Sequence, residues 1–131
     1  MNITAAVLQI AVRIIGPIMI ILGLLFWSGN ALQLIPLHML IGITLVLIMW
    51  ALAVLGAVAG LNLGFVALTA VWGLVIPILG LTQERLLTNS LHWLIQLLHL
   101  AVGLVALALA DRLAAGIKAR SGSSSLSARA A

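Results

Sequence analysis

The chain contains no cysteine, and only two of its 131 residues are acidic. Without cysteine it can form no disulfide, thiolate metal site, iron–sulfur cluster or covalent c-type haem attachment through C-x-x-C-H. Charged residues make up 6% of the chain, far below the roughly 25% that is typical of a soluble domain. Potential metal ligands are therefore limited to histidine, carboxylate and methionine.

The chain is strongly apolar: 65% of its residues are hydrophobic and the mean hydropathy is +1.37. This composition predicts an integral membrane protein. The net charge of +4 comes largely from the C-terminal region, where Arg112, Lys118, Arg120 and Arg129 follow the last apolar run. No basic stripe suggests nucleic-acid binding, and this cluster is instead placed to contact anionic lipid headgroups.

Four apolar runs are each long enough to cross a bilayer, over about residues 3–27, 31–59, 63–81 and 90–115. The loops between them are short, so consecutive helices must be antiparallel neighbours. We therefore predict an all-α, up-down-up-down four-helix bundle over residues 1–116. The Ser-rich, basic segment 117–131 is expected to be a disordered tail.

Basic residues are distributed unevenly about these spans. The loops near residues 28–31 and 60–62 carry no Lys or Arg, and the loop near 82–90 carries only Arg85. Because cytoplasmic segments are enriched in Lys and Arg, we expect both termini to be cytoplasmic, with a bacterial inner membrane as the location.

A short sequence motif occurs twice. The hexapeptide LHMLIG at residues 37–42 returns 61 positions later as LHLAVG at residues 98–103. Pro17 and Pro77, which lie inside the first and third apolar runs, are 60 positions apart. The spacing suggests a duplicated helical hairpin.

Pro36 leaves the start of the second helix open. The repeat favours a start near Ala31, with Pro36 as a kink, because the fourth helix begins at the equivalent position. Alternatively, Pro36 occupies the first helical turn, and His38 then lies closer to the membrane surface.

The two copies of the motif place His38 and His99 on parallel, diagonal helices, so their side chains can face each other across the bundle. This arrangement suits two axial imidazole ligands of one haem iron. Gly42 and Gly103, one turn deeper on the same faces, would leave room for a flat macrocycle. In the alternative interpretation, each histidine only forms hydrogen bonds within a helix interface.

Three further polar residues are candidates near this chemistry. His92 or Arg85 could donate a hydrogen bond to a haem propionate, although an interfacial position without function also explains His92. Arg13, inside the first span, either extends to the membrane surface or pairs with another group. We expect no acidic residue at its depth, because Asp111 is predicted to be interfacial.

Four spans with His38 and His99 on parallel helices resemble the four-helix transmembrane b-type cytochromes, which include cytochrome b561-like and superoxide oxidase-like proteins. This resemblance implies haem b and electron transfer with quinone, superoxide or a redox protein. Those families usually carry four ligating histidines for two haems. The single pair here therefore implies one haem b per chain.

The predicted function is that of a haem b-binding electron-transfer protein and, if it is an enzyme, of a membrane oxidoreductase. The alternative is a cofactor-free membrane scaffold or anchor subunit that assembles through glycine-rich helix faces. Gly56 and Gly60 form one such small-xxx-small pair, and a homodimer is an open alternative to packing within the chain.

Overall fold

The computed structural model describes the backbone of residues 2–130 and the side chains of residues 3–122. This part of the chain forms four α-helices: α1 (Asn2–Trp27), α2 (Ile35–Val58), α3 (Leu63–Thr82) and α4 (His92–Ala130). Single 3-10 turns, η1 (Leu32–Leu34) and η2 (Gln83–Arg85), lie between α1 and α2 and between α3 and α4. All four helices are long and apolar enough to cross a membrane, which confirms the predicted all-α membrane bundle.

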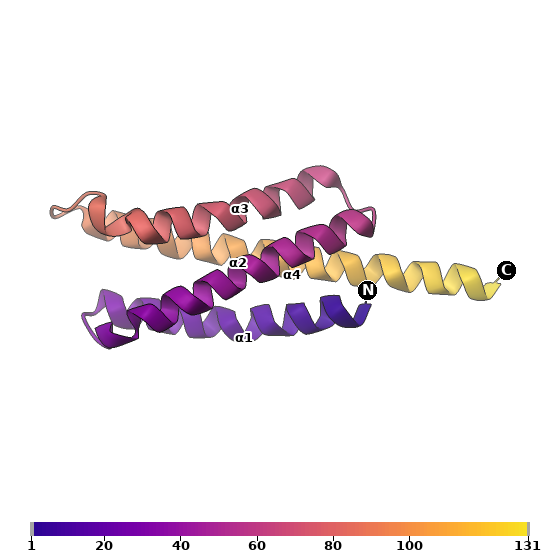
Figure 1. Ribbon diagram of the computed structural model, residues 1–131, viewed down its shortest axis with the longest axis horizontal. Coiled ribbons are helices and arrows are strands. Elements are labelled where there is room, and N and C mark those ends of the chain that lie inside the picture. The colour runs from indigo at the N-terminus through magenta and orange to yellow at the C-terminus, as the bar shows by residue number, and fades with distance from the viewer. Residues whose placement is uncertain (1, 131) are drawn as a thin grey trace.

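Successive helices run antiparallel, so the topology is up-down-up-down (Figure 1). The α1–α2 and α3–α4 connections, residues 28–34 and 83–91, lie together at what we call the histidine end. The start of α1 and the α2–α3 turn, residues 59–62, lie at the opposite, terminal end. The parallel helices α2 and α4 pack directly against each other, whereas α1 and α3 make no close approach in the described backbone. The bundle therefore has a short diagonal, from α2 to α4.

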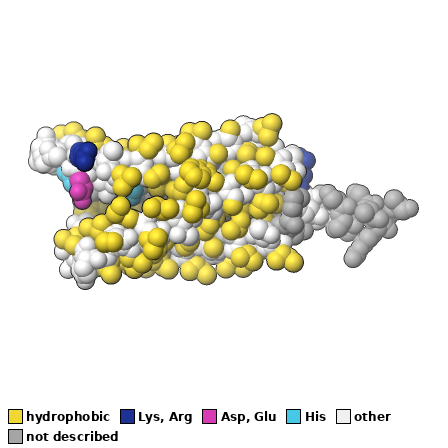
Figure 2. Space-filling view, in the orientation of Figure 1, with side chains coloured by type: hydrophobic (Ala, Val, Ile, Leu, Met, Phe, Trp, Pro, Cys, Tyr) yellow, Lys and Arg dark blue, Asp and Glu magenta, His cyan; other side chains and the backbone are white. Residues whose placement is uncertain are grey.

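The core is centred on this short diagonal. Its largest completely buried side chains include Met49 and Leu52 of α2 and Leu113 and Ile117 of α4. The outer faces carry large exposed hydrophobic side chains over the length of the bundle (Figure 2). Helices that are apolar all round are expected where lipid replaces water as the solvent.

The turn between α2 and α3 is defined by local chemistry. Gly60 adopts a positive φ of 70° directly after α2 ends, a conformation that glycine enters without steric cost. The Asn62 side chain then accepts a hydrogen bond of 3.0 Å from the backbone N–H of Phe65. This N-cap satisfies one of the free donors at the start of α3, close to the predicted helix start at residue 63.

The favoured start of the second helix near Ala31 is wrong, and the alternative is correct. Helix α2 begins at Ile35, with Pro36 in its first turn. Proline suits this position because its fixed φ is helical and its missing N–H has no partner to bond there. Ala31 instead adopts a left-handed φ of 56°, which separates α1 from η1.

The end of α4 also differs from the expectation. The sequence predicts a helix end near residue 115 and disorder from residue 117, whereas α4 continues to Ala130. Ile117 is completely buried. A Cβ built on Gly116 would lie 3.3 Å from the Leu61 side chain, which places the α2–α3 turn against this part of α4. Tertiary contacts therefore keep α4 helical beyond Gly116, despite the low helix propensity of glycine.

Candidate cofactor site

His38 of α2 and His99 of α4 face each other across the short diagonal. Their ring centroids are 6.3 Å apart, and the ring planes are inclined by 47°. The Nδ1 atom of each ring is buried and has no hydrogen-bond partner. Buried polar atoms are nearly always paired, so these two unpaired atoms single out the facing rings as the candidate site in the described part of the chain.

The two rings meet although different numbers of helical residues precede the two histidines. His38 is the fourth residue of α2, whereas His99 is the eighth residue of α4. The three-residue turn η1 precedes α2 and makes up most of this difference. The two rings therefore lie at one level of the bundle even with this start of α2, since they approach to 6.3 Å.

The other two helices close the sides of the histidine pair. Phe26 of α1 meets the His38 ring edge-on, with centroids 5.4 Å apart and planes at 73°. On α3, a Cβ built on Gly80 would lie 3.3 Å from Cε1 of His99. Each imidazole is thus held between its own helix and one neighbour, in largely apolar surroundings.

The two glycines predicted to make room for a macrocycle have different surroundings, and their role stays a prediction. A Cβ built on Gly42 would meet only the terminal methyl group of Met19, at 3.3 Å, so Gly42 faces α1. A Cβ on Gly103 would meet nothing within 4 Å. The glycine in contact with an imidazole is Gly80, which the sequence analysis did not select because the rotation of α3 about its axis is not visible in the motif.

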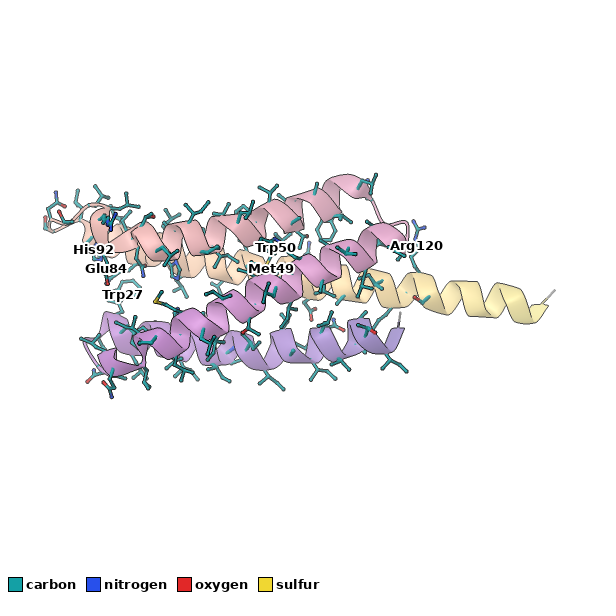
Figure 3. The ribbon with its side chains drawn as sticks, in the orientation of Figure 1. Trp27, Met49, Trp50, Glu84, His92 and Arg120 are labelled. Atoms are coloured by element: carbon teal, nitrogen blue, oxygen red, sulfur yellow. The ribbon has the colours of Figure 1, made fainter. Side chains whose placement is uncertain are left out.

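His92 and Arg85 lie at the histidine end but are not joined to the histidine pair. The His92 Nδ1 atom is 3.2 Å from the backbone carbonyl of Leu86, in the adjacent connection. Arg85 is exposed in η2. Figure 3 shows His92 and Glu84 near this end of the bundle. His92 precedes His99 by seven residues, or about 10 Å along the helix axis.

Arg13 has an acidic partner, which corrects the expectation that none lies at its depth. Its Nε atom donates to Asp111 Oδ1 at 2.7 Å, and Nη2 donates to Oδ2 at 3.3 Å. The Gln9 side-chain amide donates to the same Oδ1 at 2.9 Å. The antiparallel register of α1 and α4 brings these residues together, and that register cannot be read from separate apolar runs.

The candidate site offers two imidazoles as potential ligands. No cluster of three or more His, Cys, Asp or Glu side chains with metal-binding geometry occurs in the described part of the chain. Comparisons with protein families, curated proteins and solved structures found no match. The function is therefore inferred from the residues and their geometry.

Proposed function

We propose that this chain is a membrane cytochrome b that binds one haem b between His38 and His99 and transfers single electrons. The observation that carries the proposal is the pair of facing, half-buried imidazoles whose buried Nδ1 atoms have no hydrogen-bond partner in the described part of the chain. A neutral imidazole nitrogen without a hydrogen bond is available as a metal ligand.

The separation of the rings supports ligation of one metal ion. A metal–imidazole bond is about 2.0 Å long and a ring nitrogen lies about 1.1 Å from its centroid, so two opposed rings require centroids about 6.2 Å apart. The observed distance is 6.3 Å. This spacing is compatible with a shared ion, and it also lies within the range of about 4.5–7 Å for packed rings, so the unpaired Nδ1 atoms are the stronger argument.

Two protein ligands favour a metal that brings its other ligands with it. A haem supplies four nitrogens of its own and needs only the two axial positions. Gly80 allows α3 to lie directly against the His99 ring, because a Cβ there would be only 3.3 Å from Cε1. The bound group would supply a reversible one-electron couple, while His38, His99 and the apolar surroundings would set its potential.

The proposed reaction partners follow from closure of both axial positions. An iron held by two histidines has no free position for a small ligand, which favours electron transfer to or from quinone, superoxide or a soluble carrier. The protein would then act as a membrane oxidoreductase or as an electron carrier. Haem b as the cofactor comes from the resemblance to four-helix b-type cytochromes, and a bacterial inner membrane is the proposed location.

The distribution of charged residues supports the proposed orientation of the bundle in the membrane. Arg112, Lys118 and Arg120 lie toward the terminal end on α4, whereas the histidine end carries Glu84 and Arg85. By the positive-inside rule the terminal end, with both termini, faces the cytoplasm. The histidine pair then lies nearer the external leaflet.

The glycine faces are used within the chain, which weakens the alternative of a scaffold that assembles through them. A Cβ on Gly56 would lie 2.9 Å from Leu113, and a Cβ on Gly73 would lie 2.9 Å from Trp50. Gly60 adopts its positive φ in the α2–α3 turn. Gly56 and Gly60 therefore serve packing and chain reversal in the described structure.

The visible spectrum of protein purified in detergent after expression with ample haem tests the proposal. We expect a Soret band and sharp α and β bands on reduction, all lost in both His38→Ala and His99→Ala. His92→Ala is the matched control and should retain them, because its ring bonds locally. Colourless wild-type protein, or loss of haem in His92→Ala but not in His99→Ala, would contradict the proposal.

A further inference from the structure

The ion pair between Arg13 and Asp111 lies on the outside of the bundle, on the line along which α1 packs against α4; we call this strip of surface the groove. The exposed fractions of the two side chains are 64% and 35%, while Gln9 beneath them is buried. Asp111 accepts from Nε and Nη2 of Arg13, and Nη1 makes no hydrogen bond within the described part of the chain. The guanidinium is therefore fixed in place with donors still directed outward.

A second cation lies in the same groove. Lys118 follows Asp111 by two helical turns, on the same face of α4, and interacts electrostatically with it. The two positive charges of Arg13 and Lys118 exceed the single negative charge of Asp111. The groove thus carries a net positive charge, which the ion pair leaves uncompensated.

The groove lies within reach of the membrane surface at the terminal end. Leu61, in the α2–α3 turn, contacts α4 at Gly116. Asp111 lies five residues before Gly116, or about 7.5 Å along the axis, and Lys118 lies beyond it. A ligand at the surface can therefore contact Lys118 and extend inward to the outward-facing guanidinium of Arg13.

The charge and surroundings of the groove select among its potential occupants. A second copy of this chain would bring another groove of the same positive charge, which disfavours such a pairing. A free anion would leave the exposed side chain of Ile10, one turn before Arg13 on α1, uncovered. A phospholipid with a negatively charged headgroup supplies both a phosphate for the cations and acyl chains for the apolar surface.

We infer that the groove between α1 and α4 binds an anionic phospholipid, whose phosphate is held by Arg13 and Lys118. Asp111 acts as a positioning residue, because it holds the guanidinium in the groove through two hydrogen bonds. This site lies apart from the histidine pair and does not depend on haem binding.

Lipid-dependent thermal stability tests the inference. Phosphatidylglycerol is titrated into the full chain in neutral detergent, with phosphatidylcholine as the reference lipid, and the melting temperature is followed by circular dichroism. We expect a larger increase with phosphatidylglycerol. Arg13→Gln and Lys118→Gln should each weaken the apparent affinity for phosphatidylglycerol about fivefold. Arg112→Gln, which removes the same charge from an exposed position about 100° around α4 from Asp111, should weaken that affinity less than either of them.

The difference in melting temperature between the two lipids distinguishes lipid binding from an ion pair that only stabilises the fold. If Arg13 only stabilises the fold, Arg13→Gln lowers the melting temperature equally in both lipids and the difference between them persists, which overturns the inference. Lys118→Gln keeps the test decisive if Arg13→Gln does not fold. An equal effect of Arg112→Gln would also overturn the inference, because the lipid would then be attracted by the overall positive charge of the terminal end and not by this site.

Two further experiments test the other potential occupants of the groove, a free anion and a second copy of the chain. If millimolar inorganic phosphate alone reproduced the increase and abolished the effect of phosphatidylglycerol, the ligand would be a free anion and the inference would fail. Because the chain has no cysteine, Ala108→Cys introduces a unique thiol on the exposed face of α4, one turn from Asp111. Efficient disulfide formation between two copies in membranes would show that a second chain covers the groove.

Discussion

Gly80 of α3 lies directly against the imidazole of His99: a Cβ built at this glycine would be 3.3 Å from Cε1 of the ring. That distance is tighter than an ordinary van der Waals contact, so a side chain here must displace the ring. The position of His99 is therefore set in part by a residue on a neighbouring helix, 19 positions earlier in the chain.

Replacing Gly80 should accordingly affect the histidine pair. Gly80→Val is expected to lower haem affinity by displacing the His99 ring, as measured by titration of haem into the apoprotein and the Soret absorbance. Gly103→Ala is the control, because a Cβ there meets nothing within 4 Å. It should retain affinity and leave stability unchanged or slightly raised. Loss of haem in Gly103→Ala alone would place the macrocycle against α4 instead.

Gly56 permits the close approach of α2 and α4 on the short diagonal. A Cβ there would be 2.9 Å from Cδ1 of Leu113 and 3.4 Å from Val66. Gly56→Leu should therefore lower the free energy of unfolding by about 1–3 kcal/mol through overpacking. Gly23→Leu, at a position with nothing within 4 Å, should have little effect when both are measured by SDS titration from mixed micelles. If Gly56→Leu changed only the oligomeric state, the scaffold alternative would regain support.

Trp72 links α3 to α4 through a hydrogen bond from its indole Nε1 to the carbonyl of Val102, at 3.0 Å. Trp72→Phe removes this donor and keeps most of the aromatic volume. We expect a loss of about 0.6 kcal/mol in unfolding free energy, the average for hydrogen bonds between transmembrane helices. Trp93→Phe is the control, because Trp93 is exposed and its indole makes no hydrogen bond in the described structure. Equal effects of the two substitutions would argue against the bond as the cause.

Arg13 and Asp111 should behave as a coupled pair in the unfolding equilibrium. Arg13→Gln and Asp111→Asn are each expected to lower the melting temperature, because each leaves one charge without its partner. The double variant should be more stable than the sum of the two losses predicts. The measurement is a double-mutant cycle on melting temperatures in neutral detergent. Strict additivity would show that the two bonds seen here do not contribute to stability.

The spans and their order could be predicted because composition alone determines them. A chain this apolar must satisfy its backbone hydrogen bonds within helices, and Asn62 and Pro36 carry local signals for helix starts. The approach of His38 and His99 also followed from the repeat, because two parallel diagonal helices place equivalent residues at one level. The repeat misled only on the start of α2, where proline chemistry outweighed the 61-residue correspondence.

Helix register and rotation could not be predicted. The pairing of Arg13 with Asp111 depends on how far α1 slides along α4, and no residue spacing within either run records that. The contact between Gly80 and His99 depends in the same way on the rotation of α3. Both are properties of packed pairs of helices, so they required the structure.

The short turn at residues 59–62 is the one covalent link between the α1–α2 hairpin and the α3–α4 hairpin, and it lies at the opposite end of the bundle from the two rings. Each hairpin contributes one histidine, so neither can assemble the pair by itself. The site is thus created by the meeting of two half-molecules in the bilayer, and not by chain continuity. Two separately translated hairpins, one carrying His38 and the other His99, have every contact they need to rebuild it.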